Sequence, residues 1–526
     1  MTQRPVSYHD FPYPRLTFPR THPAHLGAIA RLMAVNAAPP ERCRVLELGC
    51  ASGANLIPMA FGLPESQFLG VDLSAHQIAE AQRVTQDLGL RNVAFQAANL
   101  MDLGAELGTF DYVIAHGLYS WVPAPVRDKL LSLCGEVLSP HGVAYISYKT
   151  YPGGHVADMV RQMGLYHNHA AEPSEWPRRM GELVQLLRTG IPEKRTAYRA
   201  AVLDHTKRML DESPGALLHD DLEADSEPVY FHQFAAHADR HGLQYLGEAE
   251  FPAMRGAGIE PEALERIGAG DDLLEFEQYL DFLYGRSFRA TLLCRKDVPL
   301  DRALRPERIV DLYVVPEIQP ESTDGPNQAS GQTEVEAPTS QRYRTVYGLL
   351  EVTEPAAQLA LAQLARNRSQ AMSLPALLDA IHEGASGSAP IELNLGQLAE
   401  WVLDWHATGV VELCTWAPKF ARQPTTRPKA SELARYEAHR GWDVSSLIHR
   451  RVRLTDPLAR RTLQLLDGHH NREQIVQELL PAVSSAEVNL SHDKRTLTER
   501  SDIAAALRRQ IDAYLQDFAR QALLIA

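Results

Sequence analysis

The sequence has few cysteines and none of the local signals of a secreted or membrane-spanning protein. Its five cysteines are scattered, and no two form a CxxC pair, which argues against a disulfide framework or a cysteine-ligated zinc site. The opening string MTQRPVSYHDFPYPR lacks the apolar core of a signal peptide, and no stretch approaches the roughly 18 uncharged apolar residues of a membrane span. We therefore expect a cytoplasmic bacterial protein without membrane insertion.

The sequence also lacks an excess of positive charge. Lys and Arg number 52 against 66 Asp and Glu, so the formal net charge is -14. This balance argues against unspecific binding to nucleic acid through the whole surface. The basic stretch at residues 427–461, which includes HRRVRL at residues 449–454, is interpreted as a strand edge kept soluble by arginine. No nucleic-acid partner is expected.

Apolar runs alternate with helical patterns in the first third of the 526 residues. Strand-like runs lie at residues 43–49, 67–74, 92–100, 110–117 and 141–150. Such alternation predicts an α/β fold, a Rossmann-like parallel sheet covered on both faces. Residues 243–251 and 287–297 predict a closing antiparallel pair in the same sheet, so the helical block after residue 154 is predicted to be an insertion into one domain.

The second half of the chain is predicted to be mostly helical. The string at residues 316–341 has acidic residues but no basic ones and no apolar periodicity, which predicts disorder inside a linker at residues 298–345. Residues 346–526 follow a helix, helix, strand order that suggests a winged-helix-like C-terminal domain. We expect a fragment without residues 316–526 to fold.

A glycine-rich turn after the first strand carries the chemistry. The string VLELGCASGANL, residues 45–56, spaces Gly49 and Gly53 without the GxGxxG pattern of a pyrophosphate loop. Glu47 would repel a phosphate but can receive an ammonium group. S-adenosylmethionine has an ammonium group and no phosphate, so this loop predicts S-adenosylmethionine as the cofactor rather than NAD.

Other strand ends complete the predicted cofactor site. A carboxylate after the second strand, Asp72, is placed to accept two ribose hydroxyls, while Asn99 and Leu100 are placed against adenine. An N-terminal arm with Tyr13 and His22 either covers the cofactor or lies on the surface. The full set of predicted cofactor contacts is Glu47, Gly49, Cys50, Ala51, Gly53, Asn55, Asp72, Leu73, Asn99, Leu100, His116, Tyr13 and His22.

Seven strings resemble one known family. They are PYPRLTFPRTHPAHL, RVLELGCASGANLIPMA, FLGVDLSAHQIAEAQ, FDYVIAHGLYSWVP, YISYKTYPGG, YFHQFAAHADRHGLQYLGEAEF and LDFLYGRSFRATLLCRK. They resemble the class I S-adenosylmethionine-dependent methyltransferases that carry a methyltransferase regulatory domain, best known from the rickettsial outer-membrane-protein lysine methyltransferases. The resemblance covers most of residues 6–297 and is loose beyond them.

The resemblance implies a domain plan and an activity. It implies an S-adenosylmethionine-binding methyltransferase domain at residues 1–297, with a helical insertion at about 154–228 and a regulatory-type segment at about 217–297. The implied reaction is methylation of lysine side chains of proteins. Three positions depart from the family pattern: Asn99 replaces a usual Asp, Lys149 a usual Asn, and Gly154-His155 a usual Gly-Trp. The last two put the substrate in doubt more than the cofactor.

The loop after the fourth strand is predicted to lie beside the methyl group. His116, Tyr119 and Trp121 are the predicted catalytic residues, because aromatic walls can desolvate the acceptor amine and lower its pKa. The predicted substrate contacts are Tyr119, Ser120, Trp121, Tyr148, Lys149 and Tyr151. Simple packing of the loop onto the sheet is the alternative.

No metal site is predicted. His237 and His241 have the i, i+4 spacing of zinc ligands on a helix, but the sequence shows no HExxH motif and no nearby third ligand. A solvated helix face is the preferred interpretation.

Three functions remain open at this point. The first is protein lysine methylation, the second is a small-molecule N- or O-methyltransferase, and the third is a non-catalytic regulator that senses the cofactor. A protein substrate is the expected partner, and a homodimer is left open.

Overall fold

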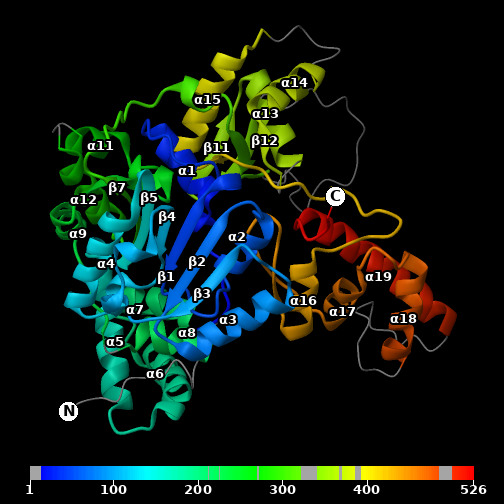
Figure 1. Cartoon of the computed structure of the whole chain (residues 1–526), viewed down its shortest axis with the longest axis horizontal. Helices are drawn as coiled ribbons and strands as arrows, with labels where there is room; N and C mark the ends of the chain where they lie inside the picture. Colours follow the sequence, from blue (N-terminus) through cyan, green and yellow to red (C-terminus); the bar gives the residue numbers. More distant parts are fainter. Residues whose placement is uncertain are drawn as a thin grey trace.

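A seven-stranded sheet forms the centre of the computed structural model, which describes residues 13–210, 213–223, 225–268, 272–320, 340–366, 370–384, 392–484 and 500–525 (Figure 1). The strands are β1 (Arg44–Leu48), β2 (Gln67–Asp72), β3 (Val93–Ala97), β4 (Phe110–Ala115), β5 (Leu138–Lys149), β6 (Leu243–Glu248) and β7 (Phe288–Arg295). Their order is β3-β2-β1-β4-β5-β7-β6. Strands β1 to β5 are parallel, and β7 runs antiparallel to both β5 and β6. The predicted fold class and closing antiparallel pair are confirmed.

Both faces of the sheet are buried, as the near-continuous apolar strands predict. Along β1, Val45 belongs to one apolar core and Leu46 to the other. Helices α1 (Pro23–Leu32), α2 (Leu56–Gly62) and α3 (Ala75–Asp87) contribute to the first core. Helices α4 (Ala124–Val137) and α9 (Phe231–Arg240) contribute to the second. The strand alternation therefore sets which helices cover which face.

Local sequence signals fix several helix ends. The Ser74 hydroxyl accepts a hydrogen bond from the Gln77 backbone N–H at 3.4 Å and so caps the N-terminus of α3. Helix α9 ends two residues before Gly242, whose φ of +72° a glycine adopts without steric cost.

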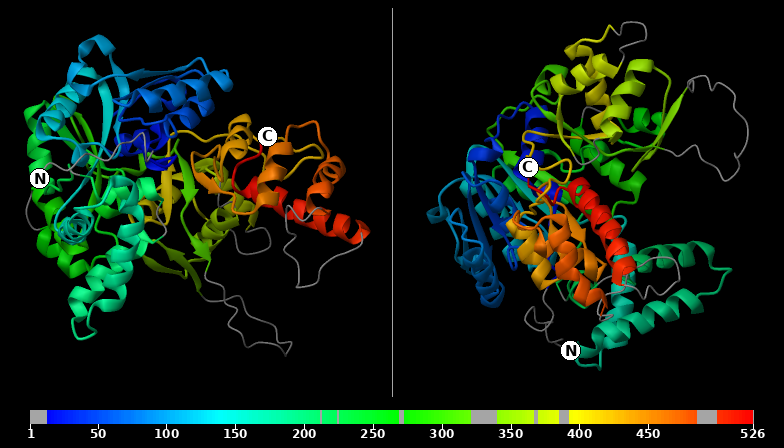
Figure 2. Two further views of the ribbon diagram at one scale, coloured as in Figure 1. Left: turned by 90° about the horizontal axis from the view of Figure 1, so that it is seen from below. Right: turned by 90° about the vertical axis from the view of Figure 1, so that its right-hand side faces the viewer.

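The predicted helical insertion projects from the sheet (Figure 2). It consists of α5 (Gly154–Asn168), α6 (Trp176–Gly190), α7 (Thr196–Met209) and the short α8 (Pro214–Ala216). A small core of its own includes Val160, Met180, Val184 and Leu218. The chain then returns to the sheet through α9, and the β6–β7 connection contains α10 (Phe251–Met254), α11 (Pro261–Ile267) and α12 (Leu273–Tyr284).

A buried ion cluster holds the β6–α12–β7 region together. The Arg289 side chain is fully buried, and its guanidinium donates to the carboxylates of Glu248, Glu277 and Asp281 at 2.5–3.0 Å. The guanidinium carbon also lies 3.9 Å from the centroid of the Phe231 ring. The buried positive charge of Arg289 is therefore compensated by three carboxylates, as burial of a charged side chain requires.

The segment after β7 differs from the predicted linker. Within residues 298–345, β8 (Tyr313–Pro316) pairs with β12 (Met372–Ser373) and β13 (Val411–Cys414). Just after β13, the Thr415 backbone N–H donates to the Ala24 carbonyl of α1 at 3.0 Å. The apolar run of β8 is therefore a strand, and most of the string predicted to be disordered (residues 316–341) lies outside the described residues.

The first C-terminal unit shares a core with the methyltransferase sheet. It contains β9 (Gln319–Pro320), β10 (Gln341–Thr345), β11 (Gly348–Val352), α13 (Pro355–Arg366), α14 (Leu374–Gly384) and α15 (Leu395–Ala407). Val314, Leu361, Val402 and Leu413 belong to the same apolar cluster as Ile29 of α1. The apolar side chains of this unit thus extend the core that α1 forms with the sheet.

A second C-terminal unit has a separate core and lies apart from α13–α15 (Figure 2). It contains α16 (Glu432–Arg440), β14 (Asp443–Ser445), β15 (Arg451–Arg453), α17 (Pro457–Leu465), α18 (Arg472–Ser484) and α19 (Arg500–Arg520). Residues 346–526 were predicted to form one domain, and the structure divides them between two cores instead. None of the helices in the described residues is long and apolar enough to cross a membrane.

Candidate active site

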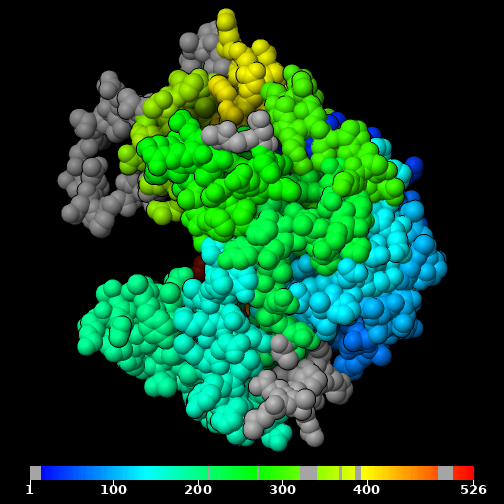
Figure 3. Space-filling model, turned by 90° about the vertical axis from the view of Figure 1, so that its left-hand side faces the viewer, coloured from blue at the N-terminus to red at the C-terminus, as the bar shows by residue number. Residues whose placement is uncertain are grey.

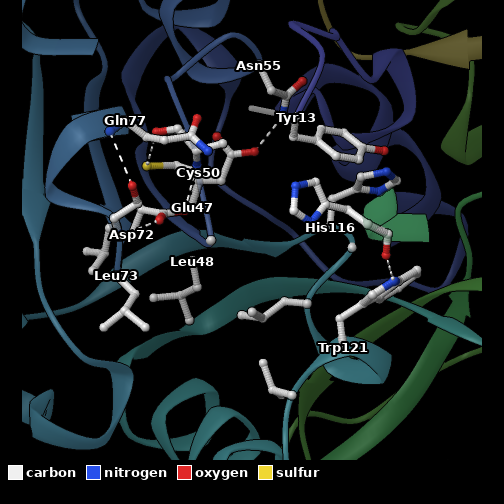
Figure 4. A pocket seen from close by; sticks show the side chains of 18 of the residues that line it. Tyr13, Glu47, Leu48, Cys50, Asn55, Asp72, Leu73, Gln77, His116 and Trp121 are labelled. Carbon is white, nitrogen blue, oxygen red and sulfur yellow. Dashed lines mark hydrogen bonds between the residues drawn. The ribbon is translucent and has the colours of Figure 1, made fainter. Parts of the chain in front are cut away.

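A cavity of about 520 Å³ lies at the carboxyl ends of β1 to β4. The strand order reverses there, between β1 and β4, where open α/β sheets bind their ligands. Twelve of the sequence-predicted site residues line it: Tyr13, Glu47, Gly49, Cys50, Ala51, Asn55, Asp72, Leu73, Asn99, Leu100, His116 and Trp121. Figure 4 shows Glu47, Cys50 and Asp72 on one side of this cavity and Tyr13, His116 and Trp121 on the other.

Glu47 offers a carboxylate oxygen to the cavity. The side chain is buried, and its Oε1 accepts from Asn55 Nδ2 at 2.8 Å. Its Oε2 is buried and has no hydrogen-bond partner among the described residues. Burial raises the pKa of Glu47 to about 8, against the opposing effect of the Asn55 hydrogen bond. An ammonium group is the partner that this orphaned acceptor fits.

Asn55 joins three distant parts of the chain behind Glu47. Its Oδ1 accepts from the backbone N–H of Phe18 at 2.9 Å and lies 2.9 Å from Nε2 of His449. Its Nδ2 donates to Glu47 and to the Thr21 hydroxyl, the latter at 3.0 Å. The amide therefore uses all four of its hydrogen-bonding positions. His449 belongs to the second C-terminal unit, so that unit reaches the cofactor loop.

Asp72 is oriented by two backbone groups. Its Oδ2 accepts from the Ala51 N–H and its Oδ1 from the Ser74 N–H, both at 2.8 Å. These bonds leave acceptor positions on both oxygens for a pair of hydroxyls. Burial raises the pKa of Asp72, although the two hydrogen bonds oppose that shift. The neighbouring Leu73 is 75% exposed at the cavity, which suits an apolar contact with a flat ring.

Two predicted cofactor contacts lie elsewhere. A Cβ added to Gly53 would come within 2.6 Å of the Phe95 ring, and its φ is +72°. Gly53 therefore shapes the loop but does not line the cavity. His22 was predicted to cover the cofactor, but its Nδ1 accepts from the Ala24 N–H and caps α1. Its ring stacks on Trp416, which holds it away from the cavity.

His116 and Trp121 form the far wall of the cavity. Burial lowers the pKa of His116 to about 4, so its imidazole is neutral at pH 7. His116 Nδ1 lies 3.0 Å from the Tyr145 hydroxyl, and its ring centroid lies 3.7 Å from that of Phe18. Trp121 Nε1 donates to the His219 carbonyl at 2.9 Å. Both rings are thus held in place by contacts with neighbouring residues.

The prediction that Tyr119 faces the acceptor is wrong. Residues 119–121 form a single 3₁₀ turn, which directs Trp121 to the cavity and Tyr119 to the opposite side. The Tyr119 hydroxyl lies 2.8 Å from His237 Nδ1, and its ring packs edge-on against Phe234.

The other predicted acceptor contacts are also absent from the cavity lining. The Ser120 hydroxyl accepts from the Lys149 backbone N–H at 2.8 Å, and the Tyr148 hydroxyl pairs with Thr291. Lys149 Nζ lies 4.9 Å from the centroid of the Trp121 ring and donates to Ser226 Oγ at 2.9 Å. Lys149 therefore contacts the Trp121 ring but does not line the cavity. Tyr151 stacks on His155.

Several lining residues were not predicted. Phe18 comes from the same N-terminal arm as Tyr13, so the prediction that this arm covers the cofactor could have been extended to Phe18. His219 and Asp220 come from the end of the insertion, about 100 residues after Trp121, and no local signal marks them. The Tyr13 hydroxyl donates to Asp220 Oδ2 at 3.3 Å, so the arm crosses the cavity to the insertion.

A second cavity of about 400 Å³ adjoins the first. Phe18 and His116 line both cavities, so the two cavities meet at these side chains. The second cavity is also lined by Tyr145, Phe288 and several paired charges that include Arg20 and Glu250. The two cavities offer one space for a cofactor and another for an acceptor.

Replacing Asp72 with alanine is expected to weaken binding of S-adenosylmethionine by about 1–3 kcal/mol, the usual cost of an unpaired polar group. The loss arises because both ribose hydroxyls would face an apolar methyl group. Calorimetric titration with S-adenosylhomocysteine measures it. Gln77→Ala, which removes another polar side chain that lines the cavity, is the control, and equal losses in the two variants would contradict the role of Asp72.

Cofactor binding is expected to strengthen as the pH rises from about 6 to 8. In the free protein Glu47 is largely protonated below its pKa of about 8, and a bound ammonium group would lower that pKa. Binding below pH 8 therefore releases a proton, and affinity should approach about a tenfold gain per pH unit. Calorimetry in buffers of different ionisation enthalpy counts that proton. Glu47→Gln should bind more weakly and lose this pH dependence, and a proton count of zero in the unaltered protein would contradict it.

Comparisons with known proteins agree with this geometry. Family models match three segments: a methyltransferase domain at residues 45–142, a predicted methyltransferase regulatory domain at residues 213–295, and a "PKMT, C-terminal winged helix domain" at residues 426–523. The uncharacterized protein RP789 of Rickettsia prowazekii is 28% identical over 98% of this chain and 93% of its own length. The uncharacterized protein RP028 of the same organism is 34% identical over 46% of this chain and 97% of its own length.

A solved structure extends the comparison to the whole chain. PKMT2 from Rickettsia typhi in complex with AdoHcy (S-adenosylhomocysteine) superposes with a TM-score of 0.85 and 26% identity, over 98% of this chain and 100% of that one. The sheet order, the cavity with its orphaned carboxylate and these matches agree. The chain belongs to the class I S-adenosylmethionine-dependent methyltransferases that carry a methyltransferase regulatory domain.

Proposed function

We propose that this methyltransferase methylates lysine side chains of a protein substrate. The observation that carries the proposal is the match to PKMT2, whose abbreviation we read as protein lysine methyltransferase, because the match covers 98% of this chain and so includes the insertion and both C-terminal units. Matches that cover only the cofactor-binding sheet would leave the substrate class open.

The second cavity suits the end of a lysine side chain. Methyl transfer requires a neutral amine, and deprotonating lysine at pH 7 costs roughly 4–5 kcal/mol from its reference pKa of about 10.4. The wall of Phe18, His116 and Phe288 would remove water from the amine and lower that cost. The imidazole of His116 is neutral at pH 7 and so adds no positive charge beside the sulfonium.

The surface has room for a protein segment. Figure 3 shows a deep notch between the helical insertion, coloured blue-green, and the green and yellow-green segments above it. In this proposal the substrate protein lies in that notch and extends one lysine toward the wall of Phe18 and His116. A small-molecule acceptor needs no such notch, although a cavity of about 400 Å³ could hold one.

Incubation with methyl-labelled cofactor and a cell lysate tests the proposal. Label in protein bands that is recovered as methyl-lysine after acid hydrolysis is the expected result. Label confined to the small-molecule fraction would contradict it and would favour the small-molecule alternative. A variant with Asp72→Ala and Glu47→Gln, which should not hold the cofactor, is the background control.

Replacing Phe288 with alanine is expected to raise KM for a lysine-bearing acceptor by about tenfold, with little change in kcat. Phe288 is 41% exposed and lines the second cavity together with Phe18, so in this proposal its ring contacts the acceptor rather than packing in the core. Steady-state kinetics with separate cofactor titrations measures the effect. Tyr119→Phe is the matched control and should leave turnover unchanged, because that ring faces α9. A larger loss in Tyr119→Phe than in Phe288→Ala would reverse this assignment.

A further inference from the structure

Three side chains from α4 and α9 meet outside the active site. Asp128 lies near the start of α4, while His237 is in the last turn of α9 and His241 immediately follows that helix. Asp128 Oδ1 is 3.2 Å from His237 Nε2 and 2.9 Å from His241 Nε2, and the three candidate ligand atoms all lie within 4.8 Å of one another. Ligands bonded at about 2.0–2.1 Å in a tetrahedral site lie roughly 3.3 Å apart. The two distances from Asp128 to the histidine nitrogens are therefore already close to the spacing of ligands around one ion.

The contact between the Tyr119 hydroxyl and His237 supplies a second, independent feature of a metal site. The Tyr119 hydroxyl lies 2.8 Å from His237 Nδ1, the ring nitrogen on the side away from Asp128. Histidines that bind metals usually donate their other N–H to an oxygen acceptor, which fixes the ring and its tautomer. The Tyr119 hydroxyl oxygen is placed to accept that N–H.

The charges at the cluster are compatible with a divalent cation. Asp128 supplies the one carboxylate of the cluster, and its negative charge would offset part of the charge of a bound cation. Arg240 is the nearby opposing charge, whereas Arg127 is neutralised by its ion pair with Glu227.

We propose that Asp128, His237 and His241 bind a divalent transition-metal ion of the zinc class, with solvent completing its coordination. Imidazole and carboxylate donors select such ions over magnesium or calcium. The sequence showed no third ligand near the two histidines, and folding supplies one from α4, more than 100 residues earlier. The ion would cross-link α9 to α4. Helix α9 lies in the segment matched by the regulatory-domain model, and α4 lies in the segment matched by the methyltransferase model.

Titration of metal-stripped protein with Co²⁺, followed by visible absorption, and with Zn²⁺, followed by calorimetry, tests the site. One equivalent should bind, with the absorption bands of low-coordinate Co²⁺, and the thermal unfolding temperature should rise. Asp128→Asn and His241→Ala should each lower affinity by about tenfold or more. Tyr119→Phe should lower it by about tenfold without changing the stoichiometry.

A matched control separates this site from unspecific binding to surface histidines. His141→Ala removes an exposed histidine on β5 and should leave the titration unchanged. Asp128 is exposed, and Asn preserves its shape, so this variant should fold even if His241→Ala does not. The proposal is overturned if no saturable binding occurs, or if Asp128→Asn binds the ion as tightly as the unaltered protein.

Discussion

Removing residues 316–526 is expected to abolish cooperative folding, whereas removing only residues 418–526 is expected to leave a folded protein. The first deletion takes away β13 and α13–α15, whose apolar side chains complete the core beneath α1. Ile29 and the rest of that helix face would be exposed, and apolar surface of this size promotes aggregation. The sequence alone predicted that residues 1–315 would fold. The structure instead leads us to expect that residues 1–417 are needed.

The shorter deletion removes a unit with its own core and mainly polar connections. Tyr436 donates to Asp87 at 2.7 Å, Arg450 pairs with Glu317, and His449 contacts Asn55. Thermal unfolding followed by circular dichroism should show one cooperative transition for the fragment of residues 1–417 and none for that of residues 1–315. A cooperative, cofactor-binding fragment of residues 1–315 would show that the core beneath α1 is dispensable.

Replacing Arg289 with methionine is expected to lower the free energy of unfolding by about 3–5 kcal/mol, the cost of leaving buried charges unpaired. Glu248, Glu277 and Asp281 would lose their shared guanidinium inside the β6–α12–β7 region. Denaturant unfolding measures the loss. Arg266→Met breaks the exposed pair with Glu262 and should cost less than about 1 kcal/mol.

The pH dependence of that loss identifies its origin. Burial raises the pKa of Glu277 to about 7 even with Arg289 present, and removing the guanidinium would raise it further. Protonation of the carboxylates at lower pH removes the unpaired charges, so the deficit of Arg289→Met should be smaller at pH 5.5 than at pH 8. A deficit that is equal at the two pH values would point to lost packing against Phe231 instead.

Sequence patterns predicted those features that depend on neighbouring residues. The alternation of β1 to β5, the cap at Ser74 and the cofactor loop with Glu47 and Asp72 all follow from local periodicity and turn chemistry. These signals placed twelve predicted residues in the first cavity, although their individual roles stay predictions. The predicted domain plan is revised within residues 298–526, where β8 and two cores were found, and the cytoplasmic location stays a prediction.

The features that sequence patterns missed depend on side-chain direction and on long-range contacts. Periodicity cannot tell which way a single 3₁₀ turn points Tyr119 and Trp121, and one of the two was assigned to the wrong side. His219, Asp220 and His449 reach the active site from remote segments, and Asp128 completes a histidine cluster from another helix. Tertiary packing alone brings these groups together.

The four hydrogen bonds of Asn55 make cofactor affinity and the docking of the second C-terminal unit thermodynamically linked. His449 approaches Asn55, and Asn55 in turn orients the carboxylate of Glu47. A partner that pulled His449 away would alter the affinity for S-adenosylmethionine by some factor. Because such coupling is reciprocal, bound cofactor would alter the affinity for that partner by the same factor. Binding of the cofactor in the first cavity would thereby change how tightly a partner binds the second C-terminal unit.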